Sequence, residues 1–177
     1  FRGQFESRMK GLIDEVKRIA AQRHLKSAVI TFAQHPQAVL RPDSDIKMLM
    51  TVPDKVAEIG RHGIDVTVLL NFAYELSLNK SRQFLQLLRD RYGVAVLVVG
   101  YDHRFGHDKS ETFADYVRHG KELGIDVVKA PEYLGEYAPV SSSIIRRLIA
   151  SGKVDDAMRC MGRPYTLSGK VVHGFHN

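Results

Sequence analysis

Apolar positions in this sequence follow two alternating spacings, one typical of helices and the other of buried strands. Between residues 8 and 22, apolar side chains recur every three or four positions, which predicts an amphipathic helix. The next run, Ala28-Val29-Ile30-Thr31-Phe32, is short, apolar and largely β-branched, as in a strand buried on both faces. The two patterns then alternate, and they predict helices at 53–62, 80–91 and 110–123 and strands at 65–70, 94–99 and 125–128.

This alternation of strands and helices is typical of an α/β fold. It predicts an open, parallel sheet flanked by helices, in which ligands bind at the carboxyl ends of the strands. Two short helices are predicted next, at 141–149 and 154–161, and the pattern changes after Pro164. Residues 165–173 are predicted to form a strand with no helix after it. We therefore expect one domain over 1–161 and the start of a second, cut off at Asn177, over 162–177.

Charge and cysteine content narrow the classes of function. The formal net charge is +6, and residues 141–177 hold six Lys or Arg against two Asp or Glu, which accounts for +4 of it. Such a local excess attracts anions, whether phosphate, nucleotide or nucleic acid. Cys160 is the only cysteine, so an internal disulfide is impossible and we expect a reducing, cytoplasmic setting. No apolar run approaches the roughly 18–20 residues that span a membrane, and we expect no membrane partner.

Three segments interrupt the core pattern and are candidates for chemistry. The first, Gly100 to Gly106, directly follows the most strand-like stretch and contains two glycines, an acid, a base and two aromatic residues. Glycines let the backbone approach a ligand closely, and an aromatic ring can stack on a planar group. No Gly-Lys-Ser/Thr follows at the spacing of a phosphate-binding P-loop. An ordinary polar loop explains these residues equally well.

The second segment, Pro139 to Arg147, places three serines directly before a helical run. Such serines cap a helix, and the exposed N–H groups of a helix start also bind anions. Arg146, one turn into the helix, has the fork geometry that suits a phosphate. A plain capped helix with surface arginines is the alternative.

The third segment, Thr31 to Pro36, ends the first predicted strand, and Pro36 favours an extended conformation at His35. A lone loop histidine is more often structural than functional. His103 and His107 lie four apart across a glycine-containing loop without the glutamate of a zinc-protease pattern, and we predict no protein metal site. Cys160 lies among helical apolar positions and is interpreted as a packing residue.

Together the three segments resemble the bacterial bifunctional riboflavin kinase/FMN adenylyltransferases. Thr31-Phe32 with His35-Pro36 looks like that family's Thr-Phe-x-x-His-Pro, and Gly100 to Gly106 is similar to its Gly-x-Asp/Asn-Phe-x-Phe-Gly, with His103 at the first Phe. Ser141 to Arg146 resembles its Ser-Ser-Thr-x-Ile-Arg. The most specific likeness is the joined string Gly152-Lys153-Val154, Ala157, Gly162-Arg163-Pro164-Tyr165 and Ser168 to Gly174.

The resemblance implies a Rossmann-like nucleotidyltransferase domain followed by the first strand of a β-barrel riboflavin kinase. The first would transfer AMP from ATP to FMN, giving FAD and pyrophosphate with Mg²⁺ on the ATP. The second would phosphorylate riboflavin only in the full-length protein. By resemblance, ATP phosphates would be bound by Ser141, Ser142, Ser143 and Arg146. The flavin or nucleotide would lie near Phe32, His35, Asp102, Phe105 and Gly106.

The superfamily's His-x-Gly-His signature is absent, whether the chain is aligned from Phe1 or from Leu12-Ile13. The first strand of the fold, which precedes that signature, is absent too, and the chain does not begin with methionine. A segment missing from this sequence, an altered protein, or a natural relative that binds nucleotide without transferring AMP would each explain this. The joint absence of strand and signature favours the first, so we expect a fragment and assign no catalytic residue.

A nucleic-acid-binding domain is the weakest interpretation. The basic residues are not interleaved with a stripe of aromatic side chains, and no recognition motif is present. We therefore expect small-molecule partners and no nucleic acid. The sequence does not indicate an oligomeric state.

Overall fold

Strands and helices follow one another in the predicted order. The computed structural model describes residues 4–34, 39, 47–71, 79–100, 110–131 and 141–169. The elements are α1 (Gln4–Gln22), β1 (Ala28–Phe32), α3 (Val52–Arg61), β2 (Val66–Leu70), α5 (Ser81–Tyr92), β3 (Val96–Val99), α6 (Phe113–Leu123), β4 (Asp126–Lys129), α7 (Ser142–Ala150) and α8 (Val154–Met161). All six predicted helices and the first four predicted strands are confirmed, with ends shifted by a few residues at most.

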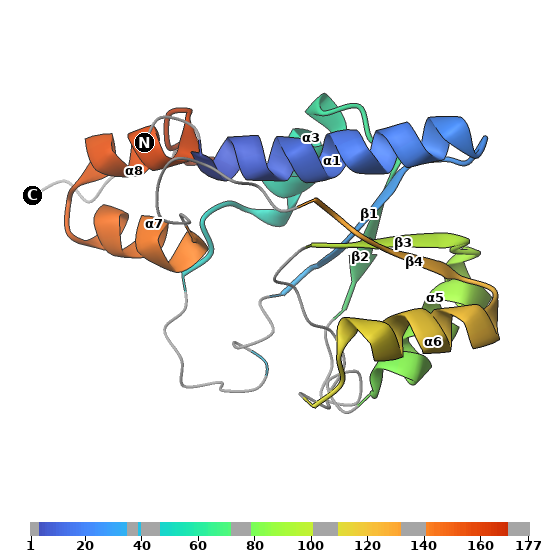
Figure 1. Cartoon of the computed structure of the whole chain (residues 1–177). Coiled ribbons are helices and arrows are strands. Elements are labelled where there is room, and N and C mark those ends of the chain that lie inside the picture. The colour runs from blue at the N-terminus through green and yellow to red at the C-terminus, as the bar shows by residue number, and fades with distance from the viewer. Residues whose placement is uncertain are drawn as a thin grey trace, which may run out of the picture.

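The strands form two parallel pairs. β1 pairs with β2 in a register that runs from Ala28 opposite Val66 to Phe32 opposite Leu70, and β3 pairs with β4. Within the described ranges no backbone hydrogen bonds join the two pairs into one sheet. The sequence predicted a single open sheet. The α/β class and the parallel direction are confirmed. In Figure 1, α1 and α3 lie on one side of the strands and α5 and α6 on the other.

β1 is less buried than its sequence predicts. Ala28 is exposed, and the other four residues of the strand are half-buried rather than buried on both faces. The described residues give this strand one hydrogen-bonded neighbour, β2, so that one of its edges lacks a paired strand to cover it. The prediction of a strand at this position is therefore right, and the prediction of its full burial is wrong.

The buried side chains form three clusters. The first cluster joins α5 and α6 to β3 and β4, and its most buried side chains are Leu85, Tyr116 and Ile125. A second cluster joins α1 to α3 and includes the buried side chains of Ile13 and Ile59. The third joins α7 to α8 around Ile145, Ala157 and Met161, and Cys160 packs at its edge as the sequence predicts.

The strand predicted over 165–173 is not observed where the structure describes it. Residues 164–169 have no regular secondary structure, and 170–173 lie outside the described residues. A strand requires a partner for its backbone N–H and C=O groups, and no ladder partner for 165–169 is present in the described chain. Tyr165 instead packs against the α7–α8 cluster.

Candidate functional site

The start of α7 presents three serines at an exposed helix N-terminus. Ser141 is the N-cap, with extended backbone (φ −114°, ψ 159°), and its Oγ accepts a hydrogen bond of 3.4 Å from the Ile144 N–H. Ser142 is half-buried and Ser143 exposed. Ile145, which is 0% exposed, anchors the helix and leaves this end facing outward. Hydroxyls and helix N–H groups thus lie together at this helix start, as the sequence predicts, and anion binding there stays a prediction.

Arg146 is half-buried and already has one protein partner. Its Nε donates a hydrogen bond of 2.9 Å to the backbone carbonyl of Lys47. This contact, which no sequence motif indicates, orients the guanidinium and leaves its two terminal nitrogens as the pair that can form a fork on a phosphate. Arg147, the next residue, is exposed.

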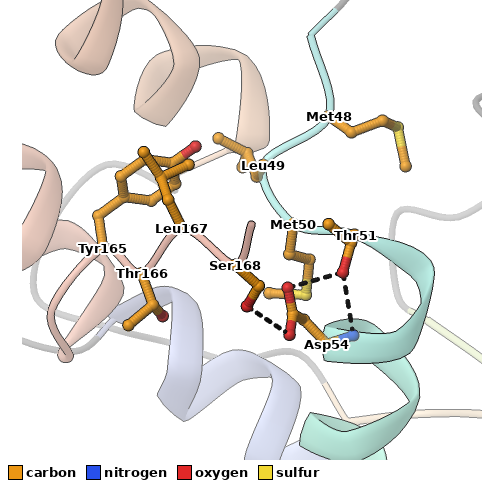
Figure 2. Close-up of a pocket in the computed structure, with 9 residues that line it drawn as sticks. All are labelled: Met48, Leu49, Met50, Thr51, Asp54, Tyr165, Thr166, Leu167 and Ser168. Carbon is orange, nitrogen blue, oxygen red and sulfur yellow. Dashed lines mark hydrogen bonds between the residues drawn. The ribbon is translucent and has the colours of Figure 1, made fainter. Parts of the chain in front are cut away.

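The segment from Lys47 to Thr51 connects α7 to α3. At one end of the segment, the Lys47 carbonyl accepts the hydrogen bond from Arg146. At the other end, the Thr51 hydroxyl caps α3 by accepting a hydrogen bond of 3.2 Å from the Asp54 N–H. Figure 2 shows the Asp54 carboxylate between two hydroxyls, those of Thr51 at 2.7 Å and Ser168 at 2.9 Å. Both hydroxyls donate to the carboxylate and hold the pKa of Asp54 below its usual value.

The same segment forms one wall of a shallow pocket. The opposite wall is formed by residues 165–168 (Figure 2). The lining residues are Met48, Leu49, Met50, Thr51, Asp54, Tyr165, Thr166, Leu167 and Ser168. Leu167 is 82% exposed, so this surface is largely apolar and carries no basic side chain that would bind a phosphate.

A lysine that the sequence analysis did not single out lies at the carboxyl end of β1. Lys55, in the first turns of α3, donates from Nζ to the carbonyl of Phe32 at 2.7 Å and approaches Thr31 Oγ1 at 3.4 Å. Partial burial lowers the pKa of this ammonium group. In the sequence, the only sign of this lysine's position is that it lies one helical turn after Thr51, the N-cap of α3. Lysines are too common at such positions for this to indicate a site.

The remaining predicted site residues fall outside the part of the chain that the structure describes. These are His35, Asp102, Phe105 and Gly106, as well as the rejected pair His103 and His107. Phe32 is described and is half-buried at the end of β1.

The described residues offer neither a cluster of metal ligands nor a membrane-spanning helix. No group of three or more His, Cys, Asp or Glu residues is placed to hold a metal ion within these ranges. No helix among them is long and apolar enough to cross a membrane.

Comparisons with known proteins agree on one family. A family model described as FAD synthetase matches residues 10–144. Among curated proteins, the bifunctional riboflavin kinase/FMN adenylyltransferase of Listeria monocytogenes is 29% identical over 93% of this chain. Its Bacillus subtilis counterpart is 31% identical over 92%, and that of Escherichia coli (strain K12) is 25% identical over 97%.

The match covers only part of each relative. The chain spans 52% of the Listeria and Bacillus proteins and 56% of the Escherichia protein, which is about half the length of these relatives. Among solved structures, the crystal structure of a macrolide-efflux protein from Streptococcus pneumoniae superposes with a TM-score of 0.77. It covers 89% of this chain and 60% of that one at 23% identity, a likeness that concerns the fold alone.

Proposed function

Because this chain belongs to the FAD synthetase family, we propose that it transfers AMP from ATP to FMN in FAD biosynthesis. The single observation that carries the proposal is the family match over residues 10–144. The relatives are named as bifunctional enzymes, and a full-length protein of their kind would also phosphorylate riboflavin. These names favour an enzyme over a relative that binds flavin or nucleotide without catalysis.

The reaction places clear demands on the protein. A phosphate oxygen of FMN attacks the α-phosphorus of ATP, the bond from that phosphorus to the bridging oxygen breaks, and pyrophosphate leaves with the electron pair. Positioning and charge neutralisation therefore dominate over covalent help from side chains. We assign the phosphates to Ser141, Ser142, Ser143 and Arg146. The exposed helix start and the bond from Arg146 Nε to Lys47, which orients the guanidinium, support this assignment.

The flavin or the adenosine part is assigned to the other predicted residues. Phe32 ends β1 and His35 follows it, and β3 is followed in the sequence by Asp102, Phe105 and Gly106. In parallel α/β proteins the carboxyl ends of strands form the ligand-binding edge, which supports the assignment. No residue of this chain is given the part of the His-x-Gly-His signature, which the sequence lacks.

Mg²⁺ is proposed to enter with the ATP. The side chains assigned to the phosphates offer hydroxyls and a cation but no carboxylate, which suits a metal bound by phosphates and water rather than by protein. When bound, the ion would neutralise charge on the ATP phosphates. The assigned residues themselves orient the phosphates at the start of α7.

The finer fold and the domain boundary belong to the same proposal. A nucleotidyltransferase-type, Rossmann-like sheet is supported by parallel strand pairs with helices on both sides. The end of α8 at Met161, followed by Gly162 in the left-handed region (φ 82°), supports a boundary between 1–161 and a kinase domain that starts at 162. A single cysteine fits the cytoplasmic location that we expect.

The test is FAD formation by the purified protein supplied with FMN, ATP and Mg²⁺, followed by chromatography with fluorescence detection. We expect FAD and pyrophosphate in equal amounts. Arg146→Ala should lower kcat/KM for ATP by about 10–100-fold, because a charged hydrogen bond contributes about 1.5–3 kcal/mol.

Arg147→Ala is the matched control, since Arg147 is the exposed neighbour on the same helix. It should leave the kinetics close to those of the unchanged protein. No FAD from the unchanged protein would overturn the proposed function. Equal kinetics for the Arg146 and Arg147 variants would overturn the phosphate role of Arg146 alone.

A further inference from the structure

Lys55 holds a positive charge at the carboxyl end of β1. Within the part of the chain that the structure describes, its ammonium group contacts oxygens of neutral groups, the Phe32 carbonyl at 2.7 Å and the Thr31 hydroxyl at 3.4 Å. Among the described residues it forms no ion pair, and burial is the sole cause of its lowered pKa. A half-buried cation without a counter-ion is costly, and a bound anion would offset that cost.

The place of Lys55 differs from that of a second lysine with similar contacts. Lys17 Nζ also donates to a backbone carbonyl, that of His62, at 3.0 Å. His62 lies before β2, at the amino end of the strand pair, whereas Phe32 ends β1 and is opposite Leu70 at the carboxyl end. Only the lysine at the carboxyl end lies where parallel α/β sheets bind ligands.

A short connection links Lys55 to the residue that Arg146 contacts, which limits how far apart the two cations can lie. Arg146 is bonded to Lys47, and Thr51 begins the helix that carries Lys55. The four residue steps from Lys47 to Thr51 span at most about 14 Å when extended. Lys55 follows one helical turn later, about 6 Å along the axis. A nucleotide with several phosphates is long enough to reach toward both cations.

We propose that the Lys55 ammonium group binds a phosphate group of the nucleotide substrate, next to the phosphate site at the start of α7. A lysine acts here as a compact point charge, whose remaining N–H faces the anion while the Phe32 carbonyl orients the side chain. This inference rests on the proposed function for the identity of the ligand. The anion site itself does not depend on catalysis.

The test is calorimetric titration of the 177-residue chain with inorganic pyrophosphate, in parallel with the FAD assay. Lys55→Gln removes the charge and keeps an N–H that can donate to Phe32. We expect about tenfold weaker pyrophosphate binding and a higher KM for ATP, with Lys55→Arg retaining part of both. Lys17→Gln is the matched control and should bind like the unchanged chain.

The outcomes separate this inference from the proposed function. Pyrophosphate binding that Lys55→Gln weakens supports the anion site even if no FAD is formed. If Lys55→Gln binds pyrophosphate and ATP as the unchanged protein does, while its thermal midpoint falls, the lysine only supports β1 and the inference is overturned. A midpoint measured for every variant shows which proteins are folded when the titrations are compared.

Discussion

At the residue scale, a buried serine and an aspartate join the starts of β1 and β2. Ser27, which is 3% exposed, donates to Asp65 Oδ2 from its N–H at 2.7 Å and from its hydroxyl at 2.6 Å. The Asp65 N–H donates back to Ser27 Oγ at 3.1 Å. These bonds lower the pKa of Asp65 below its ordinary value of 3.8. The pair sets the register in which Ala28 lies opposite Val66.

We predict that Asp65→Ala lowers the thermal midpoint by a few degrees at neutral pH, because it leaves the buried Ser27 donors unpaired. A carboxyl group with a lowered pKa stabilises the fold fully above its unfolded-state pKa and loses that effect as the pH falls through its folded-state pKa. The difference from the unchanged protein should therefore narrow below about pH 4. Melting curves from pH 3 to 7, with Asp90→Ala as an exposed control, provide the measurement. A constant difference across this range would contradict the assignment.

At the element scale, α6 packs so closely on β4 that one of its positions has no room for a side chain. A Cβ added at Gly120 would lie 2.6 Å from the Ile125 carbonyl oxygen and 2.6 Å from Val127 Cγ2. Gly60, in α3, has nothing within 4 Å of the same added atom. Both glycines lie in helices, and they differ mainly in whether there is room for a Cβ atom.

Gly60→Ala should stabilise the protein by about 0.5–1 kcal/mol, because alanine restricts the unfolded chain more than glycine does. Gly120→Ala should destabilise it by about 1–3 kcal/mol, because the helix must move away from β4. Denaturant unfolding of both variants measures the two free energies. Equal effects would mean that α6 and β4 lie farther apart than described.

At the scale of the whole molecule, few described contacts connect the two strand pairs. One is the ion pair between Arg23, just after α1, and Asp126, the first residue of β4, with an N–O distance of 2.5 Å. Their side chains are 48% and 49% exposed. Exposed pairs of this kind contribute little because water screens them and both side chains lose conformational freedom.

A double-mutant cycle with Arg23→Ala and Asp126→Ala should therefore give a coupling of less than about 1 kcal/mol. The coupling should shrink further in about 1 M salt, where the Debye length is about 3 Å. Unfolding free energies at low and high salt measure it. A coupling that is large and independent of salt would show that this ion pair is shielded from solvent.

The sequence alone determined the order and type of the elements, because their periodicities are local properties of the side chains. The helix near 8–22 and the strand at 28–32 follow from where apolar residues recur, and Ser141 is recognisable as a cap from its neighbours. The family likeness was also readable there, and the family model that matches residues 10–144 confirms it.

Only the tertiary structure decided which of these features meet. The bond from Arg146 to Lys47 joins residues 99 positions apart, and Lys55 reaches Phe32 across 23. The two strand pairs among the described residues likewise depend on which partners each backbone edge finds. Such pairings are set by contacts between distant parts of the chain, and local spacing carries no record of them.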